Sequence, residues 1–165
     1  IPVPDTSKPV ALEMSNVMDK PYFEAITKNR YVNRTFIMDS QTKRKKNIKR
    51  KLNIIDHLVR NKNIIIVDDS IVRGNTIKHI VNLLKYHGVN DIYVAISCPR
   101  IVNKNKFGID IPDKESLLCH NKTNSEIEKD LGIKKIFFQN IIDLENTIHS
   151  LNTNIYSFEN SIFMD

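Results

Sequence analysis

Two adjacent carboxylates mark the part of the chain where groups able to do chemistry are most concentrated. Asp68 and Asp69 follow a run of β-branched apolar residues, and the short polar side chains of Ser70, Asn75 and Thr76 come soon after them. Carboxylates accept hydrogen bonds from sugar hydroxyls, and they also hold a hydrated Mg²⁺, which prefers oxygen ligands. The pair therefore predicts a site for a hydroxylated ligand or a divalent cation. A simple turn after an apolar strand is the alternative for the Asp pair alone.

Gly74 lies between this pair and the start of a predicted helix. Glycine carries no Cβ, so it lets the backbone approach a ligand closely. The first turn of a helix offers unpaired N–H groups and a partial positive charge, which together suit a phosphate. The carboxylates and the loop could thus hold the two ends of a phosphorylated sugar.

A parallel sheet and its helices are the elements that must position these groups. Residues 64–67, Ile-Ile-Ile-Val, are typical of a strand buried on both faces. Further strands are predicted over residues 22–27, 91–97 and 135–138. Helices are predicted over residues 11–18, 47–59, 76–87 and 141–151, with a short one after residue 123. Since strands and helices alternate with short connections, we expect an α/β fold with a mainly parallel sheet flanked by helices.

Several polar residues and one glycine predict where helices begin and end. Thr6 or Ser7 can cap the first helix, and Asn140 can cap the last. Thr123 and Glu126 have the spacing of a capping box, and Gly88 stands where a helix commonly ends.

The positive charge of the chain is concentrated in residues 28–51. This segment holds ten basic residues and one acidic residue, whereas the formal net charge of the whole chain is +6. A block of like charges repels itself and tends to stay mobile until it meets an anion. We therefore expect a flexible loop that closes on an anionic ligand. A nucleic-acid-binding module is the competing interpretation, and it predicts binding that weakens steeply with salt.

The composition excludes several classes of protein. The chain has 165 residues, of which 41% are hydrophobic and 27% charged, as is ordinary for one globular domain. It has no apolar run near the roughly 20 residues of a membrane helix, and no signal peptide is visible. Its two cysteines are too few for a disulfide framework and lack CxxC spacing, which favours a reducing compartment. The chain does not begin with Met, and we interpret residues 1–4 as a cut through something longer.

The fourteen residues 63–76, NIIIVDDSIVRGNT, resemble the phosphoribosyl-diphosphate (PRPP) signature of type I phosphoribosyltransferases. The wording DDSIVRG resembles more particularly the amidophosphoribosyltransferase family. Other segments also look like that family: residues 4–7 with 11–13, residues 28–32 with 34–37, residues 50–53 and residues 107–110. The resemblance therefore covers nearly the whole chain.

The resemblance implies a role for each matching residue. PRPP would bind to Asp68, Asp69, Ser70, Ile71, Val72, Arg73, Gly74, Asn75 and Thr76. The residues expected to face its pyrophosphate, within the first loop and a flexible loop of about residues 28–51, are Thr6, Ser7, Lys28 and Lys51. Mg²⁺ would be held by Thr6, Asp68 and Asp69. A dry passage for ammonia would be lined by Tyr31, Arg34, Thr35, Phe36 and Ile37, unless these simply pack the loop down.

The resemblance also implies an activity. The family makes 5-phosphoribosylamine from PRPP and glutamine-derived ammonia, releases pyrophosphate, and so begins purine nucleotide synthesis. Residues 1–165 would be a partial phosphoribosyltransferase domain that lacks the first strand, the glutaminase domain and its nucleophile. We expect a cytoplasmic protein that is a homo-oligomer at full length and inhibited by purine nucleotides, with no nucleic-acid or membrane partner.

The chain departs from the family pattern at three positions. Asn75 replaces a usual Thr, and Asn33 replaces a usual Gly. Asn105 stands near the first cysteine ligand of the iron–sulfur cluster that some members carry, and no CxxC follows, so we predict no cluster. Cys98 and Cys119 are expected to be buried or incidental, and the adjacent His120 does not make Cys119 a catalytic pair.

Other functions stay open at this stage. A type I phosphoribosyltransferase acting on a nucleobase or orotate would share the DDS loop but not the segment after Lys28. A non-catalytic regulator would bind PRPP without releasing pyrophosphate. IIIVDD also looks like the start of a response-regulator receiver domain, but residues 98–100, Cys-Pro-Arg, supply no acid where such a domain needs its phosphoacceptor.

Overall fold

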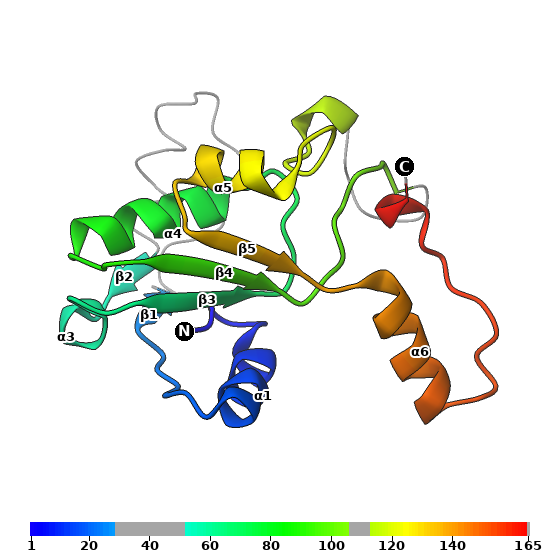
Figure 1. The fold of residues 1–165 in the computed structure, drawn as a ribbon, viewed down its shortest axis with the longest axis horizontal. Helices are drawn as coiled ribbons and strands as arrows, with labels where there is room; N and C mark the ends of the chain where they lie inside the picture. The colour runs from blue at the N-terminus through cyan, green and yellow to red at the C-terminus, as the bar shows by residue number, and fades with distance from the viewer. Residues whose placement is uncertain (29–51, 106–112, 165) are drawn as a thin grey trace.

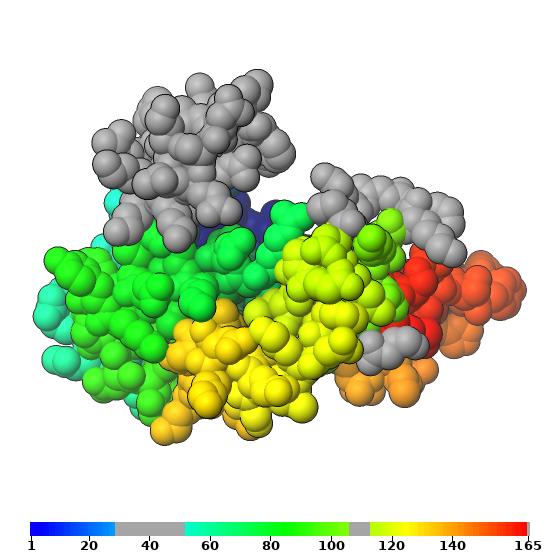
Figure 2. All heavy atoms as spheres, turned by 90° about the horizontal axis from the view of Figure 1, so that it is seen from above, coloured from blue at the N-terminus to red at the C-terminus, as the bar shows by residue number. Residues whose placement is uncertain are grey.

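The computed structural model describes residues 1–28, 52–105 and 113–164. A parallel sheet lies at its centre, in the order β3 (Ile64–Asp68), β4 (Ile92–Ile96) and β5 (Lys135–Phe138). Helices α4 (Asn75–Tyr86) and α5 (Asn124–Leu131) cover one face, and α1 (Lys8–Met18) lies on the other (Figure 1). Figure 2 views the molecule from the side of α4 and α5. The predicted parallel α/β architecture is confirmed.

A second, two-stranded sheet corrects one prediction. Strand β1 (Ile26–Lys28) pairs antiparallel with β2 (Leu52–Ile54), and a helix of only four residues, α3 (Asp56–Val59), follows. The helix predicted over residues 47–59 is therefore wrong at residues 52–54, while residues 47–51 lie outside the described part. Pairing with β1 and the alternation of apolar and polar residues outweigh local helix propensity here. The strand predicted over 22–27 begins only at Ile26.

The helix boundaries follow most of the predicted caps, but the cap predicted for the first helix is wrong: Ser7, at the N-cap of α1, makes no side-chain capping bond, and the Thr6 hydroxyl bonds to Asp69 instead. Thr123 and Glu126 form both bonds of a capping box, and Asn140 accepts from the backbone amides of Ile142 and Asp143 in the first turn of α6 (Ile141–Leu151). Helix α1 begins three residues earlier than predicted. Two short 3₁₀ helices, η1 (Lys114–Ser116) and η2 (Ser161–Phe163), were not predicted. None of the helices in the described ranges is long and apolar enough to cross a membrane.

The hydrophobic core lies between the sheet and α4. Ile66 of β3 and Val94 of β4 are fully buried, as are the residues of α4 that recur at helical spacing, Ile77, Ile80, Val81 and Leu84. Burial of these side chains anchors α4 directly behind β3. The loop between the two elements is therefore held at the carboxyl edge of the sheet.

The first residues of the chain run beside β3. The backbone nitrogen of Ile1 donates to the carbonyl of Ile65 at 2.9 Å, and that of Val3 donates to Val67 at 2.8 Å. The direction of this short pairing is parallel. Because the chain runs toward the carboxyl end of β3, the loop that follows Val3 emerges next to Asp68 and Asp69.

Candidate functional site

The two carboxylates stand at the end of β3 in different surroundings. Asp68 is 8% exposed, and its Oδ1 accepts a hydrogen bond of 2.9 Å from the backbone nitrogen of Asp69. The pKa of the Asp68 carboxyl is raised to about 7, mainly by burial; the hydrogen bond from the Asp69 amide lowers it, and the Asp69 charge adds a smaller increase. Asp69 is exposed and points its oxygens at side chains of the neighbouring loops.

Asp69 joins the first loop to the end of β3. Its Oδ2 accepts a hydrogen bond from Thr6 Oγ1 at 2.5 Å, and its Oδ1 accepts one from Ser70 Oγ at 3.2 Å. Among the described residues, no group of three His, Cys, Asp or Glu side chains could hold a metal ion. Two carboxylates and a hydroxyl nevertheless suit Mg²⁺, which is often bound by one or two carboxylates, waters and substrate phosphates.

A pocket of about 540 Å³ opens beside these carboxylates. Its lining contains all nine residues that the resemblance assigned to PRPP, together with Val3 and Pro4 of the first loop and Ile77 of α4. Gly74 lies at the N-cap of α4 with a φ of 75°, so it takes the left-handed conformation that favours glycine. The unpaired amides of the first turn of α4 therefore lie at one pocket wall and the carboxylates at another.

Several of these residues contribute through the backbone rather than the side chain. Ile71 is buried in the main core, and the Val72 side chain packs against a second apolar cluster. Arg73 Nε lies 3.4 Å from Ser116 Oγ on η1. Ser7, expected to face pyrophosphate, is fully buried, and its hydroxyl donates to the Val3 carbonyl at 2.5 Å. Its side chain thus stabilises the first loop from within.

The sequence analysis missed Leu118, which packs against the loop of residues 70–76. Its backbone nitrogen donates to the Val72 carbonyl at 2.8 Å. A Cβ on Gly74 would lie 2.9 Å from Leu118 Cδ2, so the two residues are in close contact. The local sequence pattern cannot predict this contact, because Gly74 and Leu118 are far apart in the chain.

The basic segment is described only at its first residue. Lys28 Nζ lies 3.9 Å from Asp5 Oδ2 of the first loop, and both side chains are exposed. The remaining loop and channel candidates, Tyr31, Arg34, Thr35, Phe36, Ile37 and Lys51, lie outside the described residues, as does Asn33. Cys98 and Cys119 are both free thiols, Cys119 being buried as expected and Cys98 partly so.

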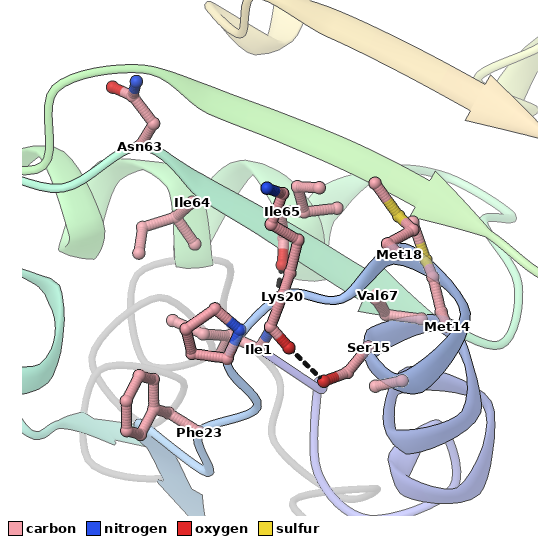
Figure 3. Close-up of a pocket in the computed structure, with 12 residues that line it drawn as sticks. Ile1, Met14, Ser15, Met18, Lys20, Phe23, Asn63, Ile64, Ile65 and Val67 are labelled. Atoms are coloured by element: carbon pink, nitrogen blue, oxygen red, sulfur yellow. Dashed lines mark hydrogen bonds between the residues drawn. The ribbon is translucent and has the colours of Figure 1, made fainter.

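A second pocket has a different character (Figure 3). It measures about 190 Å³ and lies between α1 and β3, where Met14, Met18 and Phe23 are among the apolar groups around it. The residues that line it include no Asp or Glu, and the Ser15 hydroxyl is bonded to the Lys20 carbonyl. It therefore lacks the carboxylates that would hold ribose hydroxyls or a divalent cation.

Comparison with known families finds one whose model matches most of the chain. The family described as phosphoribosyl transferase domain matches residues 1–135. The chain belongs to this phosphoribosyltransferase-domain family. The match includes the first loop, the Asp68–Asp69 pair and α4.

Relatives of this phosphoribosyltransferase domain include enzymes named amidophosphoribosyltransferase. The chain is 42% identical to the one from Saccharomyces cerevisiae and 40% identical to the one from Escherichia coli, over 163 residues in each case. These matches cover 99% of this chain and 32% of each relative. The chain thus spans about a third of the length of these relatives, and it corresponds to their phosphoribosyltransferase region.

A solved structure supports the fold of the domain. The glutamine PRPP amidotransferase from B. subtilis, complexed with ADP and GMP, matches with a TM-score of 0.81 and 33% identity. The match covers 99% of this chain and 36% of that one. The similarity in sequence and in structure confirms the predicted resemblance to the amidophosphoribosyltransferase family.

Proposed function

We propose that this chain is the phosphoribosyltransferase part of an amidophosphoribosyltransferase, which makes 5-phosphoribosylamine from PRPP and ammonia and releases pyrophosphate. The observation that carries the proposal is that Asp68, Asp69 and the first turn of α4 line one pocket, with the Thr6 hydroxyl bonded to Asp69. PRPP bears the complementary groups on one molecule. It has ribose hydroxyls, a 5-phosphate, and a cation-binding pyrophosphate at the anomeric carbon.

The carboxylates would hold the ribose and the cation. Asp68 and Asp69 accept hydrogen bonds from the ribose hydroxyls, and with Thr6 they supply oxygen atoms to Mg²⁺. The bound Mg²⁺ would neutralise charge on the departing pyrophosphate. The ionised form of Asp68 is disfavoured by burial, and a positive charge at this site would favour it again.

The loop after Asp69 would hold the 5-phosphate. Backbone amides at the start of α4 and the hydroxyl of Thr76 are donors at this wall of the pocket. Gly74 allows the backbone to come close to the phosphate, because no Cβ stands in the way. Lys28, which lies beside Asp5 of the first loop, would add positive charge for the pyrophosphate.

The reaction needs positioning more than proton transfer. The nitrogen lone pair of ammonia forms a bond to the anomeric carbon, the bond from that carbon to pyrophosphate breaks, and its electron pair leaves on the pyrophosphate oxygen. The new ammonium group then loses a proton to solvent. Charge develops at the sugar and on the leaving group, so the donors and carboxylates of the pocket would supply most of the catalysis.

Properties of a whole enzyme belong to the same proposal. Ammonia would come from glutamine hydrolysed elsewhere in the protein, and the family's passage for it would be lined by Tyr31, Arg34, Thr35, Phe36 and Ile37. The B. subtilis enzyme was solved with ADP and GMP, which supports purine nucleotides as regulators. A homo-oligomer and a cytoplasmic location complete the proposal, and the two free thiols fit a reducing compartment.

The test compares Asp69→Asn with Asp130→Asn in the full-length protein that carries this chain. Asp130 is an exposed carboxylate on α5 paired with Lys122 at 2.6 Å, so it controls for loss of a surface charge. Pyrophosphate release from Mg-PRPP and ammonium chloride should fall about ten- to a hundredfold for Asp69→Asn, because charge-assisted bonds are lost, and should stay unchanged for Asp130→Asn. Unchanged turnover of Asp69→Asn would overturn the proposal, as would limited trypsin digestion in which duplex DNA, but not Mg-PRPP, slows cleavage within residues 28–51 of the parent.

A further inference from the structure

The end of the described chain folds back against the segment that follows β4. Ile162 of η2 accepts two hydrogen bonds at its carbonyl, from the backbone nitrogens of Val102 at 2.8 Å and Asn103 at 3.0 Å. The side-chain amide of Asn103 also donates to the carbonyl of Met164. Figure 1 shows η2, in red, beside this segment although α6 lies between them in the sequence. The contact is therefore built from the backbone of both segments and from the Asn103 side chain.

The Ile162 side chain completes a small apolar cluster that is separate from the main core. Ile162 is 6% exposed and packs with Ile101 and Leu117, which are also buried. Val72, Cys98 and Phe163 are partly buried against the same cluster. Val72 belongs to the loop that lines the PRPP pocket, so this cluster connects the end of the chain to that loop.

The cluster also connects to the loop through Leu118. This residue follows Leu117 directly, donates its backbone N–H to the Val72 carbonyl, and packs its side chain against Gly74. The loop is thus fixed at Val72 by a hydrogen bond and at Gly74 by van der Waals contact. A packed interior transmits strain, so a void beneath Leu117 would let both contacts shift.

We propose that Ile162 is a positioning residue for the loop of residues 70–76, an inference that rests on the proposed function for the identity of the ligand. The side chain fills the space behind Leu117 and Val72 and holds the loop in the conformation that presents the amides of α4 to a phosphate. Ile162 itself does not line the pocket.

Leu131 is a matched control for this inference. It is 5% exposed and has the same number of carbon atoms, but it ends α5, next to the start of the sheet rather than its carboxyl edge. Lys134, three residues later, bonds to Ile92 at the first residue of β4. Truncation of Leu131 therefore leaves a similar void on the opposite side of the fold from the PRPP pocket.

The experiment measures Mg-PRPP affinity, KM and kcat for Ile162→Ala, Ile162→Val and Leu131→Ala in the full-length protein. Ile162→Ala should raise the KM and the Kd for PRPP by about tenfold, with a smaller change in kcat, because the loop of residues 70–76 is displaced. Ile162→Val should restore most of the affinity. Leu131→Ala should lower thermal stability by a similar amount and leave both constants unchanged. If Ile162→Ala does not fold, Ile162→Val should show the same changes at smaller size.

Amide hydrogen exchange without ligand separates this inference from the proposed function. Exchange at residues 70–77 should become faster in the Ile162 variants and stay unchanged in Leu131→Ala. A parent protein that does not bind PRPP would overturn the proposed function, and the exchange result would then still decide the role of Ile162. Equal exchange and equal PRPP affinity in parent and Ile162 variants would overturn the inference, as would identical changes in Leu131→Ala.

Discussion

The Thr6 hydroxyl lies 2.5 Å from Oδ2 of Asp69, although 63 positions separate the two residues in the chain. The contact forms because the first residues run beside β3 and deliver the loop that follows them to the end of that strand. It places a hydroxyl donor on a carboxylate at the mouth of the pocket beside α4. This bond therefore joins the first loop to Asp69 at the end of β3.

Loss of the Thr6 hydroxyl should weaken Mg-PRPP binding. Thr6→Val keeps the shape of the side chain but removes the donor to Asp69 and a possible oxygen ligand of the cation. We expect the Kd for Mg-PRPP to rise about threefold to tenfold, since the pair is exposed and its bond is weakened by solvent. Isothermal titration calorimetry gives the value, and Thr6→Ser serves as the control that should bind like the parent. Equal affinity of Thr6→Val and parent would contradict this role.

The burial of Asp68 should make stability depend on pH. The unfolded carboxyl has a pKa near 3.8 and the folded one near 7, so between these values the folded state binds the extra proton. Stability therefore falls as the pH rises from about 4 to 7 and levels off above 7, by at most about 4 kcal/mol. Asp68→Asn mimics the protonated form and should remove this dependence.

Urea unfolding at pH 5 and pH 8, without Mg²⁺ or PRPP, measures the effect. The free energy of unfolding of Asp68→Asn should exceed that of the parent at pH 8 and approach it at pH 5. The same variant should lose Mg-PRPP binding, because an amide cannot replace a charged oxygen ligand. A constant difference between variant and parent across this range would show that Asp68 does not titrate as its burial implies.

Substitution of Gly74 should cost more than substitution of Gly88. Both glycines have a φ of 75°, so an alanine at either position is strained by about 1–2 kcal/mol. At Gly74 the new Cβ would also lie 2.9 Å from Leu118 Cδ2, whereas at Gly88 the nearest atom is 3.8 Å away. We expect Gly74→Ala to lose more stability in thermal unfolding and to bind PRPP more weakly, and Gly88→Ala to keep its affinity.

A double variant tests the cause of the difference. Leu118→Ala removes the side chain that the new Cβ would meet, so it should recover part of the stability lost in Gly74→Ala. Additive losses in Gly74→Ala, Leu118→Ala and the double variant would show that contact between the two residues is not the reason.

The chain should release no glutamate from glutamine. Cys119 is 1% exposed, and burial raises the pKa of its thiol, while burial raises the pKa of the Cys98 thiol to about 11. Neither cysteine then forms the thiolate that a nucleophile needs at neutral pH. An assay of glutamate release from the purified chain checks this, and iodoacetamide should label Cys98 before Cys119. Glutamate release that Cys119→Ala abolishes would contradict the prediction.

The hydrophobic periodicity and the helix-capping residues of the sequence were sufficient to predict most of the central strands and helices. The β-branched run at residues 64–67, the helical spacing in α4 and the caps at Thr123 and Asn140 each act over a few residues, so the sequence shows them directly. The helix predicted over residues 47–59 failed at residues 52–54 because those residues pair with β1, about 25 positions away in the chain.

The sequence by itself determined which residues could do chemistry here, because carboxylates, a glycine and a helix start within one short segment define a ligand site locally. Tertiary structure decided how each of them is used. It buried Asp68 and left Asp69 exposed, turned the Ser7 hydroxyl inward, and set Leu118 and Ile162 behind the loop. These outcomes depend on contacts between segments far apart in the chain, which follow from how the core packs rather than from any local pattern.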